Sequence, residues 1–277
     1  MKITNIILRE ILTKSKELNL SDYDFSKNFL IITRILNLDK DITELTITYF
    51  DFNDLEYYGK TKGIADEGIS NLQKYLPKEN HLKTLNISAG RTKTNQFTPK
   101  ALENLSTIFE TLNFLENLDI SYNLIEPNGV GTLRGGLKNL KKLKKLNVEG
   151  TSIDCLGLMY LKESLDDCNF IHLNLSNINL VSQVLITGHE PKRNIIDILK
   201  NSSNLVSLNI SNNKLDKIQI IEVIKALTDQ TKQFILFEKF IYHNNQYKEN
   251  EYEEINKVIN QRLGKQKLML NFKPKHY

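Results

Sequence analysis

The sequence contains no tryptophan and only two cysteines, Cys155 and Cys168, among its 277 residues. Two thiols cannot build a disulfide framework, and they cannot supply the four sulfur ligands of a structural zinc site. Tryptophan is one of the residues most enriched at binding hot spots, so a recognition surface on this chain must use other side chains. We therefore expect a fold without disulfides, built in a reducing compartment.

Long apolar runs are also missing from the sequence. The apolar stretch near the N-terminus is interrupted by Arg9 and Glu10, so it lacks the unbroken run of a secretory signal peptide. No segment approaches the ~20 apolar residues that a membrane span needs. We expect a cytoplasmic protein with no membrane span, or a protein exported by a route that needs no cleaved signal peptide.

The chain also lacks a strong charge of one sign. Its formal net charge is +4, and its 37 basic residues are spread along the whole sequence. Nucleic-acid-binding proteins concentrate lysine and arginine on one face, so this distribution argues against a nucleic-acid partner. The hydrophobic share of 40% and the charged share of 25% are those of an ordinary globular protein.

The main feature that the sequence does contain is an internal repeat. Residues 115–125 (LENLDISYNLI) carry apolar side chains at offsets 0, 3, 5 and 10 from the first residue, and asparagine at offset 8. Residues 205–215 (LVSLNISNNKL) repeat this pattern. Full or weaker copies of the template begin at residues 15, 42, 82, 115, 143, 170, 205, 237 and 265.

The second half of each unit has a different period. Apolar residues recur there every four positions, as at Leu133 and Leu137 and again at Leu161 and Leu165, which places them on one face of a helix. The template resembles the leucine-rich repeat signature L-x-x-L-x-L-x-x-N/C-x-L, from about residue 15 to the C-terminus. A full helix in each unit and a basic period near 28 residues resemble the ribonuclease-inhibitor-like subfamily of these proteins.

This resemblance implies an α/β fold, a leucine-rich repeat solenoid (horseshoe) with a parallel concave sheet and convex α-helices. Strands stack about 4.8 Å apart whereas helices need ~10 Å, so a stack of such units must curve with its sheet inside. We expect an N-terminal capping helix over residues 1–14, about eight repeats over 15–264, and a C-terminal capping strand and tail over 265–277.

The asparagine at offset 8 is predicted to turn inward. Its amide can pair with backbone groups that the turn after each strand leaves without partners. Thr151 occupies this position in one unit and could take over part of this role, whereas Ile178 in the next unit cannot.

Because side chains alternate along a strand, offsets 3 and 5 should point into the core, and offsets 2, 4 and 6 should face the open concavity. That face is small, polar and nearly neutral, with an acidic N-terminal end and a basic C-terminal end. The candidate partner-binding residues on it are Glu44, Tyr49, Tyr122, Glu149 and His172.

Extra residues relative to the 28-residue period fall mainly in three stretches, 53–66, 89–100 and 181–194, each between a strand and its helix. They should emerge on the same rim, where loops on a rigid scaffold commonly carry recognition. Arg91 and Arg193 are the candidate binding residues there. Neutral drift at a tolerant surface would explain the insertions equally well.

Three patterns suggest chemistry, and each has a simpler structural interpretation. The glycines of residues 129–136 (GVGTLRGG) resemble a dinucleotide-binding turn, but Arg134 stands where the third glycine is needed. His-Glu-Pro at 189–191 lacks the second histidine of a zinc-binding helix. Cys155 and Cys168 fit core positions better than a nucleophile's site. We expect no catalytic residue, no metal and no cofactor.

The predicted function is a non-enzymatic protein-protein interaction scaffold, monomeric, that binds another protein. The composition rich in asparagine, lysine and isoleucine resembles that of leucine-rich repeat effectors, which bacteria secrete into a host cell to bind a host protein. An alternative from another class is a GTPase-activating protein of the leucine-rich repeat type, because the same subfamily includes the activator of the GTPase Ran. No motif match supports that activity residue by residue.

Overall fold

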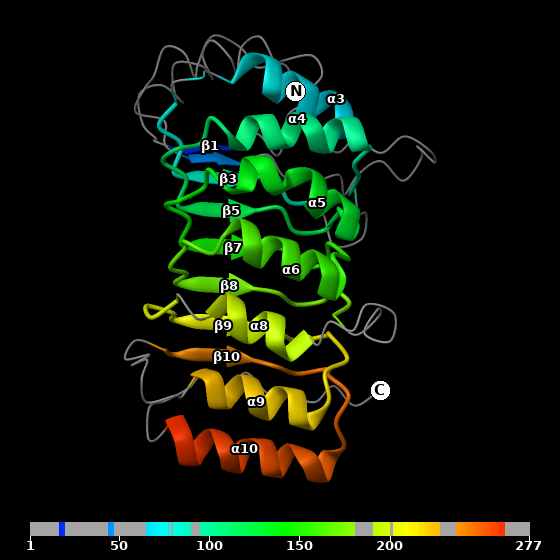
Figure 1. Ribbon diagram of the computed structural model, residues 1–277, viewed down its shortest axis with the longest axis vertical. Helices are drawn as coiled ribbons and strands as arrows, with labels where there is room; N and C mark the ends of the chain where they lie inside the picture. Colours follow the sequence, from blue (N-terminus) through cyan, green and yellow to red (C-terminus); the bar gives the residue numbers. More distant parts are fainter. Residues whose placement is uncertain are drawn as a thin grey trace.

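The computed structural model describes residues 17–19, 44–46, 65–76, 78, 80–89, 95–180, 191–199, 202–227 and 237–263. In this part of the chain, short strands alternate with helices along the sequence (Figure 1). The capping helix expected over 1–14 and the capping strand expected over 265–277 lie outside the described residues.

Within the described residues, eight strands form one parallel sheet, and their order in the sheet is their order in the chain. Two further short strands pair with each other outside this sheet. The eight strands of the sheet are β1 (Glu17–Asn19), β2 (Glu44–Thr46), β3 (Thr84–Asn86), β5 (Asn117–Asp119), β7 (Lys145–Asn147), β8 (His172–Asn174), β9 (Ser207–Asn209) and β10 (Lys239–Ile241). The short pair consists of β4 (Asn95–Gln96) and β6 (Asn123–Leu124).

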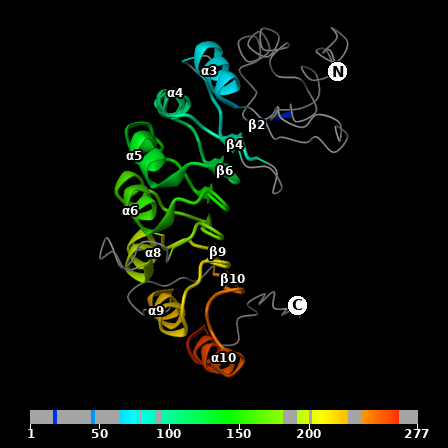
Figure 2. The ribbon, with the colours of Figure 1, turned by 90° about the vertical axis from the view of Figure 1, so that its right-hand side faces the viewer.

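The helices form a second layer on one side of the sheet. They are α3 (Ala65–Tyr75), α4 (Pro99–Phe109), α5 (Glu126–Leu137), α6 (Asp154–Ser164), α8 (Pro191–Leu199), α9 (Lys217–Leu227) and α10 (Glu249–Leu263). Seen edge-on, the molecule is a crescent with the helices on the outside and the strands on the inside (Figure 2). This arrangement confirms the predicted α/β solenoid with its sheet on the concave face.

The register of the sheet matches the sequence template at every described strand. The residue at offset 3 of one unit is the direct partner of the residue at offset 3 of the next unit. This row runs through Leu18, Leu45, Leu85, Leu118, Leu146, Leu173, Leu208 and Phe240. The repeat in the sequence therefore predicts the pairing of the strands residue by residue.

The core lies between the sheet and the helices. Within one unit, Leu115, Leu118, Ile120 and Ile125 are all at most 3% exposed, as offsets 0, 3, 5 and 10 predict. In the last described unit aromatic side chains take these places: Phe240 stacks on Tyr242, with ring centroids 5.2 Å apart. Each unit buries its apolar side against the next, and none could do so alone.

The offset-8 asparagines turn inward as predicted. Asn213 is fully buried; its Nδ2 donates to the carbonyl oxygen of Leu175 at 2.7 Å and to that of Ile210 at 3.1 Å, and its Oδ1 accepts from the N–H of Ile178 at 3.0 Å. Thr151 keeps part of this role, because its Oγ1 donates to the carbonyl of Val148 at 2.6 Å. The asparagine side chain therefore forms hydrogen bonds to the neighbouring unit, whereas the threonine side chain forms one only within its own unit.

Two glycines of the GVGTLRGG stretch, Gly129 and Gly136, allow close packing of helix α5 against its neighbours. A Cβ on Gly129 would lie 2.9 Å from Cδ1 of Leu102 in the preceding unit, and a Cβ on Gly157 would lie 3.3 Å from Cγ2 of Val130 in the unit before it. Gly136 sits so close to α4 that a Cβ would lie 2.1 Å from the carbonyl oxygen of Ser106. Close approach of neighbouring units explains Gly129 and Gly136 and supports the structural interpretation of the stretch.

Candidate functional site

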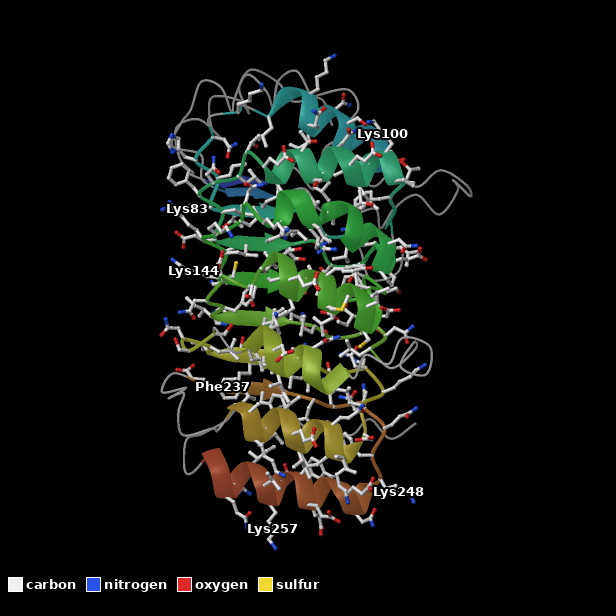
Figure 3. All side chains as sticks on the ribbon, in the orientation of Figure 1. Lys83, Lys100, Lys144, Phe237, Lys248 and Lys257 are labelled. Carbon is white, nitrogen blue, oxygen red and sulfur yellow. The ribbon has the colours of Figure 1, made fainter. Side chains whose placement is uncertain are left out.

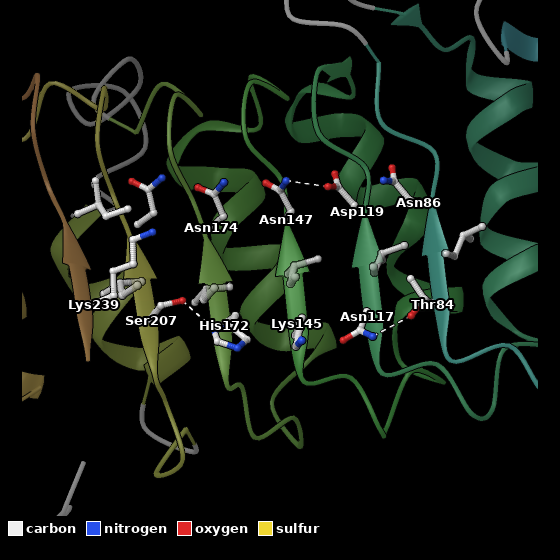
Figure 4. Close-up of a pocket in the computed structure, with 17 residues that line it drawn as sticks. Thr84, Asn86, Asn117, Asp119, Lys145, Asn147, His172, Asn174, Ser207 and Lys239 are labelled. Carbon is white, nitrogen blue, oxygen red and sulfur yellow. Dashed lines mark hydrogen bonds between the residues drawn. The ribbon is translucent and has the colours of Figure 1, made fainter. Parts of the chain in front are cut away.

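The concave face of the sheet is a groove that crosses six strands, from β3 to β10 (Figure 4). Two rows of side chains line it, one at offset 2 and one at offset 4. The offset-2 row consists of Thr84, Asn117, Lys145, His172, Ser207 and Lys239. The offset-4 row consists of Asn86, Asp119, Asn147, Asn174, Asn209 and Ile241.

The asparagine and aspartate side chains at offset 4 accept hydrogen bonds from the backbone just beyond the ends of β3, β5, β7, β8 and β9. The Oδ1 of Asn174 accepts hydrogen bonds from both the backbone N–H and the Oγ of Ser176, at 3.2 and 2.7 Å. Three serines at offset 6 make this bond to the residue at offset 4: Ser121, Ser176 and Ser211. They are only 1–3% exposed, so the expectation that offset-6 side chains face the concavity is wrong for them.

Tyr122 and Glu149, two of the predicted binding residues, are brought together in the structure. The hydroxyl of Tyr122 donates to the Oε1 of Glu149, whose Oε2 accepts from the Nδ2 of Asn174 at 3.1 Å. The ring of Tyr122 covers Gly150, where an added Cβ would lie 2.7 Å from a ring carbon. Both side chains are partly exposed, so they form one polar and aromatic patch at the end of the strands.

The backbone at Tyr122 has a left-handed conformation, with φ of 58°. The same offset-7 position is left-handed in the four following units, where φ is 70° at Gly150, 53° at Asn177, 58° at Asn212 and 54° at Asn244. Glycine and asparagine tolerate this conformation, whereas a bulky residue is strained by about 1–2 kcal/mol. Tyrosine is thus the unfavourable residue at a position that elsewhere carries favourable ones.

His172 lies on the other row, at offset 2 of β8. Its Nδ1 is 2.8 Å from the Oγ of Ser207 on the neighbouring strand. Burial lowers the pKa of His172 below its ordinary value of 6.5, and Lys145 and Lys239 lower it further, while Glu238 acts in the opposite direction. The imidazole is therefore neutral at neutral pH.

The lowered pKa of His172 makes stability depend on pH. As the pH falls below 6.5, the unfolded chain takes up this proton before the folded chain does, so the free energy of unfolding declines. We expect the melting temperature of the parent to exceed that of His172→Gln by more at about pH 8 than at about pH 5. A difference that stays constant between these pH values would contradict this. Burial also lowers the pKa of His243, so both proteins still lose some stability as the pH falls.

Four predicted binding residues have no described side chain, so the structure does not place them relative to this patch: Glu44, Tyr49, Arg91 and Arg193. Glu44 lies in β2, with its backbone opposite Thr84. Arg193 lies in helix α8, but its side chain is outside the described residues, as are Tyr49 and Arg91 altogether. Their roles remain predictions.

The lysines that precede strand β7 are largely occupied by neighbours. Lys144 forms an ion pair of 2.8 Å with Glu116, Lys141 pairs with Asp167, and the Nζ of Lys142 lies 4.2 Å from the centroid of the Phe114 ring. Lys83 and Lys144 project at the same edge of the sheet (Figure 3). Lys141, Lys142 and Lys144 are therefore engaged by neighbouring residues at the rim of the scaffold.

Both cysteines are buried, and burial raises the pKa of each thiol to about 11. A thiol with so high a pKa is a poor nucleophile at neutral pH, which supports their interpretation as core residues. No group of three or more His, Cys, Asp or Glu side chains able to hold a metal ion occurs within the described ranges.

Sequence reasoning missed the contact between His172 and Ser207. The signal was present, because both residues occupy offset 2 of adjacent units and the register makes them direct partners. The same offset places Lys145 and Lys239 in that row. The template thus identifies neighbours on the face as well as residues in the core.

The repeat, the parallel sheet and the outer helices together define the fold class: an α/β solenoid of the leucine-rich repeat type. None of the helices in the described part of the chain is long and apolar enough to cross a membrane. The sequence matches no family profile and no curated protein.

Solved structures do resemble it. A chain in the crystal structure of the yeast Rad7–Elc1 complex is 14% identical with a TM-score of 0.56, and the match covers 89% of this chain and 54% of that chain. This chain therefore spans about half the length of that relative. A protein from Bacteroides fragilis is 14% identical with a TM-score of 0.44, covering 92% of this chain and 75% of that chain. At 14% identity, the likeness to the chain in the Rad7–Elc1 structure shows the fold alone.

Proposed function

We propose that this protein is a non-enzymatic recognition scaffold that binds another protein on its concave face. The observation that carries the proposal is the groove across β3 to β10, which presents two rows of polar side chains on the side of the sheet opposite the helices. Each strand is hydrogen-bonded to its neighbours, so the groove is rigid before a partner arrives, and little freedom is lost on binding.

Two further points support a protein partner. The structure that resembles this chain with a TM-score of 0.56 is itself that of a complex, between Rad7 and Elc1. The face also combines amide, hydroxyl and charged groups with a tyrosine, a mixture suited to the polar surface of another protein. Affinity capture from a cell lysate, followed by variants of the concave and convex faces, tests the proposal directly.

Tyr122 is our candidate for the anchor of the interface. Tyrosine is among the residues enriched at hot spots, and strained backbone conformations cluster at binding and catalytic sites. Tyr122 combines both properties just beyond the end of strand β5, and its hydroxyl donates a hydrogen bond to Glu149.

Replacing Tyr122 with asparagine should separate binding from stability. Asparagine suits the left-handed backbone, as at Asn177 and Asn212, so relief of about 1–2 kcal/mol of strain should offset the lost ring contacts. We expect an unchanged melting temperature but a loss of about 2 kcal/mol or more in affinity for the captured partner, measured by calorimetry. Lys257→Gln, at an exposed position of α10, serves as the control and should bind like the parent. Full affinity in Tyr122→Asn would remove this residue as an anchor.

Within this function we also propose membership of the ribonuclease-inhibitor-like subfamily and a role as a secreted bacterial effector that acts inside a host cell. The full helix in each complete unit supports the subfamily, and the composition rich in asparagine, lysine and isoleucine supports the effector role. Capture of the same partner from host lysate, but not from bacterial lysate, is the expected result. A multiple-turnover GTP hydrolysis assay with small GTPases tests the alternative; acceleration by this protein would favour it.

A further inference from the structure

The offset-2 row of the groove changes its charge from one end of the sheet to the other. The register aligns Glu17, Glu44, Thr84, Asn117, Lys145, His172, Ser207 and Lys239 in this order. The row therefore begins with two acidic positions, continues through neutral ones and ends in a half that contains both lysines. Such a gradient favours a partner whose charges are complementary to it, and it favours one orientation of that partner in the groove.

The two lysines of the row, Lys145 and Lys239, differ from the lysine beside the row in their ion pairing. Lys144, next to Lys145 in the sequence, is paired with Glu116, whereas within the described ranges neither Lys145 nor Lys239 makes an ion pair. Lys145 is exposed and Lys239 is half-exposed toward the groove that both line. The side chains of His172 and Ser207 lie between these two lysines (Figure 4). They are hydrogen-bonded to each other and present neutral polar groups.

We infer that the basic half of this row, from Lys145 to Lys239, binds an extended acidic segment of the partner protein. The inference rests on the proposed function and specifies the chemistry of its partner. Carboxylates of the segment contact the two lysines, and its backbone crosses β8 and β9 between them. Any basic residues of the partner then lie toward the β1 and β2 end, where the row has Glu17 and Glu44 at its register positions.

The geometry fixes the spacing of the acidic residues. Strands β7, β8, β9 and β10 are consecutive in the sheet, so the two lysine positions are three strand steps apart, or about 14 Å. An extended chain advances about 3.3–3.6 Å per residue, so carboxylates four residues apart span this distance. Ile241, at offset 4 beside Lys239, offers an apolar contact where the preceding strands have asparagine.

Acidic residues on the same face favour a peptide over a nucleic acid. Asp119 lines the groove two strands before His172, Glu149 lies at the end of β7, and Glu238 directly precedes Lys239. A phosphate backbone carries a charge at every nucleotide and would meet these carboxylates. A segment with acidic residues only at every fourth position avoids them.

The test uses a capped, fluorescent peptide of about 12 residues, with glutamate at every fourth position in a background of serine and valine. We expect it to bind the full chain, and K145E/K239E to weaken binding by on the order of tenfold or more in fluorescence anisotropy. The control K138E/K257E changes the net charge equally at exposed positions on the helical side and should leave binding within about twofold of the parent. Equal weakening in both double variants would show diffuse attraction and overturn the inference.

Two further arms keep the result interpretable. If K145E/K239E folds correctly, the same peptide with lysine in place of glutamate should bind it more tightly than it binds the parent. A failure of this charge swap in a variant with normal thermal unfolding also overturns the inference. So does tighter binding of an oligothymidylate of equal charge through Lys145 and Lys239, which would indicate a nucleic acid.

The outcomes also separate this inference from the proposed function. If the captured partner loses affinity on Tyr122→Asn but not on K145E/K239E, the concave face binds a protein and only the acidic-segment inference fails. If the partner instead depends on α10, as shown by loss of affinity on Lys257→Gln, the proposed function itself fails, whatever the peptide does.

Discussion

Replacing Gly136 with alanine should destabilise the protein by about 3 kcal/mol or more. A Cβ at this position would lie 2.1 Å from the carbonyl oxygen of Ser106 and 2.8 Å from the Cβ of Phe109, both on helix α4. A backbone oxygen cannot move aside like the end of a flexible side chain, so the two helices must separate. Urea unfolding followed by circular dichroism measures the change in the free energy of unfolding.

The neighbouring glycine supplies a matched control. At Gly135 an added Cβ would meet only the Oγ of Ser106, at 3.7 Å, which is an ordinary contact. Alanine is favoured over glycine in a helix, so Gly135→Ala should stabilise the protein by about 0.5–1 kcal/mol. Two adjacent Gly→Ala substitutions are therefore expected to have opposite signs. Equal effects would show that α4 and α5 do not pack as closely as described.

Removing the side chain of Asn213 should have the second largest effect, a loss of about 3 kcal/mol. In Asn213→Ala the carbonyl of Leu175 and the N–H of Ile178 lose the partner that Asn213 provides, whereas the carbonyl of Ile210 keeps a bond of 3.1 Å from Asn245. Each buried polar group left without a partner costs about 1–3 kcal/mol. Thermal and urea unfolding of the purified variant measure the loss.

Thr151→Val provides the comparison for that loss. It occupies the same offset and removes a single hydrogen bond, from Oγ1 to the carbonyl of Val148, so we expect about half the effect of Asn213→Ala. If the two substitutions destabilise equally, bonds between units would contribute no more than bonds within one unit, and our account of the asparagine would be wrong.

The repeat template predicted most of the architecture. It placed Leu118 and Leu208 in one row of the sheet, although 90 positions separate them in the sequence, and the register confirms this. The reason is that identical units stack with identical geometry, so an offset within one unit is also a position in space. The inward orientation of Asn213 followed from the same argument.

The template was less successful for the site. It assigned Ser176 to the open face by simple alternation. The strand ends at Asn174, however, and the hydroxyl of Ser176 turns back and donates to the side chain of Asn174. Alternation holds only while the backbone stays extended, and the three-residue strands of this sheet end before offset 6. Contacts such as that of Tyr122 with Glu149 depend on the turn after the strand, which the template does not describe.

The sequence by itself determined the class of fold, the order and pairing of the strands, and the change of charge along the offset-2 row. These properties depend on periodicity, because each unit stacks on its neighbours with the same geometry. Only the tertiary structure decided which polar side chains are already bonded to one another, such as Lys144 to Glu116, and which lysines remain directed to the groove. That distinction depends on the distances between side chains of neighbouring units, which no single unit contains.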